Sequence, residues 1–455
     1  MPVLIYNAGP TAVRGSTMSG SIVDSVRHQI NTSSVSITQL TVFFIAFMLN
    51  VVDGFDVVAM SVTMPALTDD WGISATEKGY ILSAALIGMT LGAIYLAPLA
   101  DKIGRRKILL LATLMIGLSM IVTGFIPPSV EWMITIRAIS GLGIGIIFAS
   151  SATVGAEFAP DRIRNLVVTI VIMGYASGAT IVGPVANIII NHAGWEMVFV
   201  YGGVFTLLMT VMIYMYLPES VEFIASQAGD EEEKRYKINS ILNKMRCPIL
   251  PSQADIRVET LEKISVTSLF TSVLKRQTVG VWVIYFMGFM SLYFLMSWIP
   301  TLFVNNGYAR EEGIAALTLY NLGAVAGIVV IGLISTKVKL AKPISFFFMG
   351  SAAFLLYVAY MQPPSILALN TLIFIIGFLL QGAFTAMYAM AAQVYPARIR
   401  ATGIGWAAGL GRVGAILSPI LAGYLVAAAW GMYALFALFA LPLIISGLIV
   451  YWYRH

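Results

Sequence analysis

Long apolar stretches recur along this chain and constrain its fold more than any other feature. A membrane-spanning helix needs about 20 largely apolar residues, and such stretches lie approximately at 39–64, 78–100, 107–127, 132–156, 165–190, 195–217, 277–304, 313–335, 343–362, 365–392, 401–427 and 431–452. Only 11% of the 455 residues are charged, against roughly 25% in an average soluble domain. The sequence therefore predicts an all-α integral membrane protein with twelve spans.

Lysine and arginine are distributed unevenly between the turns that join these spans. The basic residues of one side are Lys102, Arg105, Arg106, Lys107, Arg162, Arg164, Lys337, Lys339, Lys342, Arg398 and Arg400. The turns of the other side offer Arg310 alone. Basic loops remain in the cytoplasm, so we expect both termini there. This placement also accounts for the net charge of +5 without a nucleic-acid partner.

The regions between and before the spans define four segments. Residues 1–37 are rich in Ser, Thr and Gly and lack a signal peptide's basic start, so we predict a disordered cytoplasmic tail, with Met1 or Met18 as its first residue. Residues 38–217 and 277–455 each hold six spans. Residues 218–276 carry nine basic and nine acidic residues, which favours a solvated cytoplasmic linker, although a regulatory or partner-binding segment is an alternative.

The two predicted halves share a motif at the same junction between their fourth and fifth spans. EFAPDRIRN at 157–165 has its counterpart in QVYPARIRA at 393–401. The pairs of matching residues are Pro160 and Pro396, Arg162 and Arg398, Ile163 and Ile399, and Arg164 and Arg400. Duplicated six-helix halves around a site near the midplane are typical of secondary transporters.

Two further motifs carry a family resemblance. APLADKIGRRK at 97–107 resembles the G-x-L-x-D-R-x-G-R-R signature of the major facilitator superfamily, and RAISGLGIG at 137–145 resembles its R-x-x-x-G-x-G-x-G. DGFD, GAEFAP, PES and YPARIRATGIGWAAGLGRVGAILSP, which start at residues 53, 155, 218 and 395, are similar to segments of the aromatic acid/H⁺ symporter family. The resemblance implies a major facilitator fold in a bacterial inner membrane. It also implies import of benzoate, hydroxybenzoates, protocatechuate or, in some members, muconate.

Two departures from the family pattern bear on mechanism. The family often repeats its acidic and basic signature between the eighth and ninth spans. IGLISTKVKLAKP, which starts at residue 331, keeps the basic residues of that repeat but has no Asp, so we expect a weaker or differently formed cytoplasmic gate there. Gly183 and Pro184 are followed by VANI and not by the G-G ending of the drug-exporter motif, which disfavours efflux.

Asp53 and Asp56 lie near the centre of the first predicted span. At a spacing of three residues, both side chains project from one helix face about 5–6 Å apart. A carboxylate near the bilayer centre costs about 2.5–3.5 kcal/mol and therefore normally faces a cavity or a partner. Burial and mutual repulsion both favour uptake of one proton by the pair, so we predict a role in proton coupling. The alternative is a structural, ion-paired or helix-bending Asp beside Gly54.

Two arginines in the predicted spans are candidate partners for charge. Arg412, flanked by glycines, offers a planar fork that can hold a carboxylate with two hydrogen bonds; alternatively it neutralises a helix end or an Asp of the other half. The resemblance implies that Arg137 is associated with proton coupling, and an interhelical structural pair is its alternative. Ring and amide side chains that stack on or hydrogen-bond a substrate complete the predicted pocket, or pack in the core: Tyr285, Phe289, Tyr293, Trp298, Asn321, Gln381, Tyr388 and Trp406.

Charged residues gather at the predicted cytoplasmic ends of the spans. The resemblance implies that they form an inner gate: Asp101, Arg105, Arg106, Glu157, Arg164, Arg398 and Arg400. A surface cluster that only sets orientation in the membrane is the alternative.

The sequence thus predicts a monomeric, proton-coupled importer of an aromatic carboxylate, working by alternating access. We expect no cofactor, because the proton gradient supplies the energy, and the expected partners are the substrate, protons and lipid. The three histidines have no ligand spacing, so no metal site is expected, and no catalytic constellation indicates an enzyme. The alternatives are an H⁺ symporter for muconate, another dicarboxylate, a shikimate-like acid or a sugar, and a transporter-like receptor that uses 218–276 as its output.

Overall fold

The computed structural model describes residues 22–227, 230–250, 266–271, 274–335, 338–396 and 399–452, and they are helical apart from turns and short connections. Met18 and Arg398 lie outside these ranges. Twelve of the described helices, counting α3 with its continuation through α4 as one span, are long and apolar enough to cross a membrane, as predicted. The protein is a multi-pass membrane protein.

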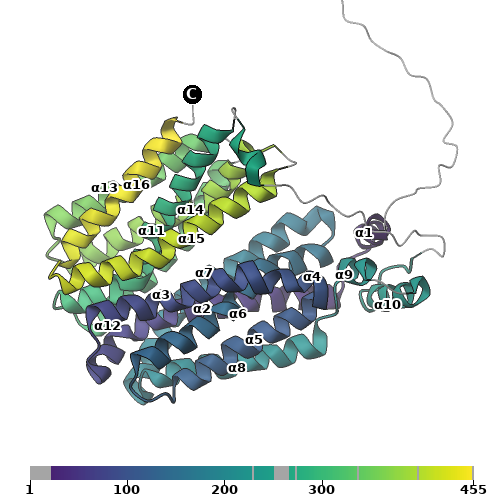
Figure 1. The fold of residues 1–455 in the computed structure, drawn as a ribbon, viewed down its shortest axis with the longest axis horizontal. Coiled ribbons are helices and arrows are strands. Elements are labelled where there is room, and N and C mark those ends of the chain that lie inside the picture. Colours follow the sequence, from purple (N-terminus) through teal and green to yellow (C-terminus); the bar gives the residue numbers. More distant parts are fainter. Residues whose placement is uncertain are drawn as a thin grey trace, which may run out of the picture.

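Figure 1 shows the spans as two groups of helices, one from each part of the chain. The N-terminal half contains α2 (Ile37–Trp71), α3 (Ala75–Leu91), α5 (Arg105–Thr123), α6 (Val130–Phe158), α7 (Asp161–Ala193) and α8 (Glu196–Tyr216). α3 continues through a π-helical segment (Gly92–Leu96) and a 3-10 segment (Ala97–Leu99) into α4 (Ala100–Ile103). The C-terminal half contains α11 (Lys275–Asn305), α12 (Arg310–Ser335), α13 (Ala341–Met361), α14 (Ile366–Val394), α15 (Arg400–Ala427) and α16 (Met432–Trp452).

Helix pairing repeats between the halves. α2 packs along α7, α3 along α6 and α5 along α8, while α11 packs along α15, α12 along α14 and α13 along α16. Glycine allows the closest crossings: a Cβ at Gly141 of α6 would overlap the carbonyl oxygen of Ala85 in α3, and one at Gly327 of α12 would overlap that of Phe378 in α14. Small residues let membrane helices approach closely enough to pack in this way.

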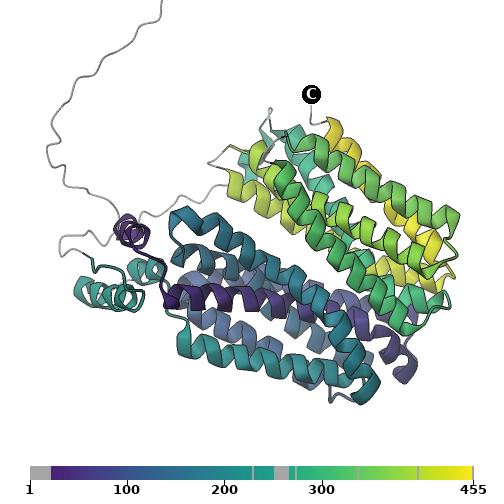
Figure 2. The ribbon, with the colours of Figure 1, turned by 180° about the vertical axis from the view of Figure 1, so that it is seen from behind.

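Short helices outside the membrane spans gather at one end of the molecule, which we call the α10 end (Figures 1 and 2). They are α1 (Ile22–Thr32), α9 (Val221–Ser226) and α10 (Glu231–Lys244). Helix α1 corrects the prediction of a disordered tail for these residues. Val26 and Ile30 of α1 are buried, and Arg27 forms an ion pair of 3.1 Å with Asp161 at the start of α7.

The two halves contact each other away from the α10 end. Among the described residues, hydrogen bonds between the halves join the Tyr80 and Tyr424 hydroxyls (2.5 Å), Ser83 and the Ile416 carbonyl (2.8 Å), Asn321 and the Ala179 carbonyl (3.0 Å), and Arg310 and Asn191 (3.0 Å). All of these residues lie in the central or opposite-end portions of their helices. The structure therefore represents a conformation in which the halves are closed together at the end opposite α10.

Candidate functional site

Asp56 of α2 is held in a buried ion pair with Arg137 of α6. The two Arg137 terminal nitrogens donate to the two Asp56 carboxylate oxygens at 2.6 and 3.1 Å, and one also donates to the Asp56 carbonyl at 3.1 Å. Ser140, one turn along α6, donates to the same carboxylate at 2.8 Å. Asp56 is 0% exposed and Arg137 is 1% exposed. This two-pronged geometry is the strong form of an ion pair.

Asp53, one turn away on α2, has a different environment. It is also 0% exposed, but neither of its carboxylate oxygens has a hydrogen-bond partner among the described residues. Its strongest charged neighbours are Arg412 of α15, in the other half, and then Asp56. The charge of Asp56 thus acts on Asp53, but the two carboxylates do not share their partners. Of the two, only Asp53 is buried without a hydrogen bond or ion pair among the described residues, which is costly for an ionised carboxylate.

Arg412 lies near the middle of α15 and is partly exposed. Its guanidinium carbon is 4.8 Å from the centre of the Phe148 ring of α6, a cation–π contact between the halves. No carboxylate of the described chain lies within ion-pair distance of it. Arg412 can therefore accept an anionic ligand without first breaking a salt bridge.

A column of aromatic rings lies beside Arg412, and we call it the aromatic wall: Tyr285, Phe289 and Tyr293 of α11 with Phe384 and Tyr388 of α14. The three α11 rings follow at intervals of four residues, with centroid separations of 6.3 and 5.9 Å. Phe384 packs edge-on to Phe289 at 4.7 Å, and Tyr388 edge-on to Tyr285 at 5.1 Å. Gly411 leaves room for this wall, because a Cβ there would lie 2.6 Å from the Phe289 ring.

The wall contains four predicted residues and one, Phe384, that was not predicted. The sequence signal for Phe384 is its position four residues before Tyr388, which places both rings on one face of α14. Arg412 acts electrostatically on Tyr293 and Tyr388, which places the guanidinium along the wall. The arrangement can hold a flat ring by stacking and its carboxylate by the guanidinium.

Four other predicted binding residues have packing contacts outside this wall. Trp298 is fully buried and donates to the Pro419 carbonyl at 3.2 Å. Trp406 is 49% exposed and stacks on Trp282 at 6.3 Å. The Asn321 amide is used in the bond to α7 described above, and the Gln381 amide nitrogen lies 3.9 Å from the Met296 sulfur. The structure therefore does not join these four to the wall.

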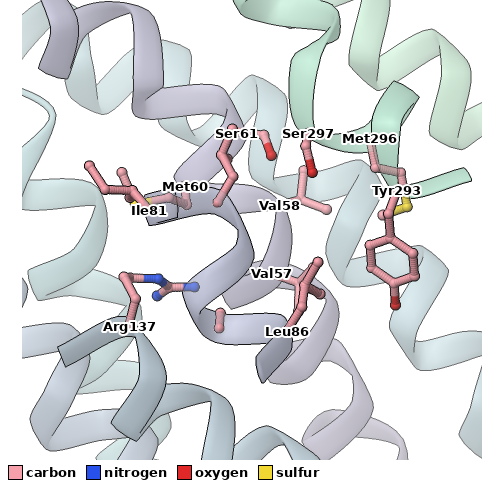
Figure 3. Close-up of a pocket in the computed structure, with 12 residues that line it drawn as sticks. Val57, Val58, Met60, Ser61, Ile81, Leu86, Arg137, Tyr293, Met296 and Ser297 are labelled. Carbon is pink, nitrogen blue, oxygen red and sulfur yellow. The ribbon is translucent and has the colours of Figure 1, made fainter. Parts of the chain in front are cut away.

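A small cavity lies between the halves, on the side of Asp53 that faces away from the α10 end. It is lined by Arg137, Ser61 and Val57 from one half and by Tyr293 and Ser297 from the other, as Figure 3 shows for these labelled residues. Its volume of about 10 Å³ has room for roughly one water molecule and none for an aromatic ring. A ring-sized ligand therefore does not fit into this cavity in the described conformation.

The predicted gate residues fall into two sets. At the α10 end, Arg105 forms ion pairs with Asp101 (2.9 Å) and Glu157 (3.4 Å), which we call the inner charge cluster. Arg106 is bonded next to it, donating from its backbone to Glu219 at 3.2 Å and from its side chain to the Tyr214 carbonyl. Sequence analysis missed Glu219, although its PES motif was noted.

The second set of gate residues lies apart from that cluster. Arg164 and Arg400 are exposed. Arg400 donates to the Tyr395 carbonyl at 3.4 Å, and Arg164 has no ion pair with any residue that the structure describes. In the part of the chain that the structure describes, the ion pairs of the inner charge cluster join residues of the N-terminal half only.

Comparison with known proteins gives relatives over nearly the whole chain. The family model for the Major Facilitator Superfamily matches residues 43–384 and again 281–455. The 4-hydroxybenzoate transporter PcaK of Pseudomonas aeruginosa is 31% identical over 421 residues, covering 91% of this chain and 92% of the relative. A gallate transporter of Pseudomonas putida is 28% identical over 426 residues, covering 93% and 94%.

A solved structure supports the same fold. The xylose transporter XylE of E. coli, in a partially occluded inward-open conformation, superposes with a TM-score of 0.71 at 17% identity. The match covers 92% of this chain and 98% of that one. Twelve spans in two paired halves and the extent of the sequence matches together show that the chain belongs to the major facilitator superfamily and, within it, to the aromatic acid transporters.

Proposed function

We propose that this protein imports an aromatic carboxylate together with a proton, by alternating access across a bacterial inner membrane. The observation that carries the proposal is the arrangement of Asp53 and Arg412. A fully buried carboxylate of one half, without a hydrogen-bond partner among the described residues, has as its main counter-charge an arginine of the other half, and that arginine forms no ion pair with any residue the structure describes.

This arrangement couples the two ligands through charge. A substrate carboxylate on Arg412 would neutralise the cation that compensates Asp53, so Asp53 would then bind a proton more readily. Conversely, a proton on Asp53 frees Arg412 for the anion, because linkage between two sites is reciprocal. Either ligand alone leaves a net charge in the buried site, whereas both together leave none, so the doubly loaded protein can rock between its two open states.

Asp56 and Arg137 have a different part in this scheme. Their ion pair is complete within one half and moves with it as a unit. We propose that the pair holds the central part of α2 against α6 and influences Asp53 through its charge. Asp53 is then the main proton-binding group.

The aromatic wall supports the proposed substrate class. Five rings beside an arginine suit a flat ring with one carboxylate, such as benzoate, 4-hydroxybenzoate or protocatechuate. The relatives named as 4-hydroxybenzoate and gallate transporters support the same class. A sugar would use hydrogen bonds and would have no need of Arg412.

The positions of the basic residues support the proposed orientation in the membrane. Arg105, Arg106, Arg162 and Arg400 lie at the α10 end, which the positive-inside rule assigns to the cytoplasm. The described conformation would then face inward, and both termini would be cytoplasmic. We propose that the inner charge cluster changes its partners when the halves meet at this end, and so acts as the inner gate.

The test is uptake of radiolabelled 4-hydroxybenzoate and benzoate into cells that express the chain, with and without a protonophore. We expect accumulation that the protonophore abolishes, and competition by unlabelled aromatic acids but not by glucose. Binding without accumulation would instead identify a receptor. Uptake that unlabelled muconate or shikimate inhibits, but unlabelled benzoate does not, would contradict the substrate class.

A further inference from the structure

Tyr175 lies on α7 at the point where α7 crosses α2 most closely. A Cβ at Gly54, the residue after Asp53, would overlap the Tyr175 carbonyl oxygen. One turn further along α7, a Cβ at Gly178 would overlap the Val51 carbonyl oxygen. The glycines therefore bring the two backbones together at Asp53 and fix the position of Tyr175 within the same half.

The Tyr175 hydroxyl is buried and has no hydrogen bond of ordinary geometry among the described residues; the side chain nearest to hydrogen bonding with it is Tyr293 of α11, in the other half. Its electrostatic neighbours are Tyr293, Asp53 and Tyr320. The hydroxyl can donate one hydrogen bond, and an ionised carboxylate can only accept. Asp53 and Tyr175 thus lie on two helices of one half that cross at Gly54, and in this conformation the hydroxyl does not yet bond to the carboxylate.

The other groups that face Asp53 cannot replace Tyr175 throughout transport. Asp56, on the same helix, is an acceptor and is already bonded to Arg137 and Ser140. Arg412 and Tyr293 belong to the other half, so their distances to Asp53 change when the halves rock. Tyr175 is the neighbour that remains beside Asp53, because it is fixed to α2.

We propose that Tyr175 is a positioning residue for proton release, whose hydroxyl donates to the Asp53 carboxylate when that group is ionised. This inference rests on the proposed proton coupling and adds a residue to it. The hydroxyl stabilises the charged form of Asp53 while Arg412 is occupied by the substrate or displaced. Without the hydroxyl, Asp53 would keep its proton to higher pH and release it more slowly.

Tyr175→Phe is the test, because it removes one oxygen atom and keeps the ring and the backbone contact at Gly54. The protonation midpoint of Asp53 is measured on purified protein from the infrared carbonyl band of the protonated carboxyl group, assigned by its loss in Asp53→Asn. A hydrogen bond to a charged group corresponds to a shift of about one to two pH units. We therefore expect the midpoint to rise by about that amount, and uptake in proteoliposomes to slow.

Tyr285→Phe is the matched control. It deletes another buried hydroxyl without a partner in the described structure, but its neighbours are Tyr388 and Tyr395 and not Asp53. Its midpoint should equal that of the wild type. An unchanged midpoint in Tyr175→Phe, or an equal shift in the control, would overturn the inference. Absence of proton-dependent uptake in the wild type would refute the proposed function itself, which is a separate outcome.

Discussion

Replacing one partner of the Asp56–Arg137 pair tests whether this pair is the structural unit described above. Arg137 is 1% exposed and makes three hydrogen bonds to Asp56. In Asp56→Asn the arginine stays charged, because its guanidinium does not lose a proton in proteins. Removing one partner of a buried pair costs about 3–5 kcal/mol, so Asp56→Asn should lose that amount of unfolding free energy.

Arg137→Gln should cost less, and its cost should depend on pH. Without the arginine, the Asp56 carboxyl can bind a proton and become neutral, which an unpaired guanidinium cannot do. Lowering the pH favours that neutral form, so the loss of unfolding free energy in Arg137→Gln, relative to the wild type, should be smaller at pH 5.5 than at pH 8. The deficit of Asp56→Asn should change little over the same range.

Thermal unfolding of purified variants in detergent at both pH values measures these differences. The double variant Asp56→Asn with Arg137→Gln leaves no buried charge, so we expect it to be more stable than Asp56→Asn alone. The reasoning would be refuted if the two single deficits simply added in the double variant. It would also be refuted if Arg137→Gln were the more damaging change at pH 5.5.

Three further outcomes follow from contacts elsewhere in the structure. Asp161→Ala removes the ion pair that holds Arg27 of α1, so trypsin should cleave at Arg27 faster while uptake is retained. Gly423→Leu places a side chain against the Ala75 carbonyl oxygen, which lies 2.6 Å from a Cβ at this position. The halves should then fail to close opposite the α10 end, so a cysteine introduced between α3 and α15 should react faster with a thiol reagent. Trp298→Phe removes one buried hydrogen bond, so stability should fall by about 1 kcal/mol without a change in the competition pattern among aromatic acids.

The architecture could be predicted because membrane helices have a strong local signal. The first apolar stretch predicted a span over 39–64, and the helix extends to Ile37–Trp71. Its true ends are set by caps: Ser36 and Gln39 form a capping box, and Gly72 ends the helix with φ of 66°. Apolar length alone does not report such polar end turns, which explains the shorter predicted limits.

The candidate site could be predicted only in part. Asp53 and Arg412 stand out because charges are rare in apolar spans, but which helix faces which is a property of the packed fold. Tyr175 carries no sequence signal of its own, since its role depends on the backbone crossing at Gly54. Trp298 was predicted to line the pocket because of its residue type, but its indole nitrogen donates to the Pro419 carbonyl of α15.

Helix α1 was missed for a different reason. Its apolar residues were present at helical spacing, with Val26 and Ile30 four residues apart, but the surrounding Ser- and Gly-rich composition indicated disorder. Burial of both side chains and the ion pair of Arg27 provide the tertiary contacts that stabilise a short helix. An isolated helix of 11 residues is marginal in water, so these contacts decide the outcome.

Uphill uptake by Asp53→Asn tests the central claim most directly. Proteoliposomes containing the wild type or the variant in equal amounts are given an inward proton gradient and labelled 4-hydroxybenzoate. The wild type should accumulate the acid above its external concentration, whereas the variant should exchange labelled for unlabelled acid without accumulating it. Full accumulation by Asp53→Asn would contradict the proposal that the proton and the substrate are coupled through this buried carboxyl group.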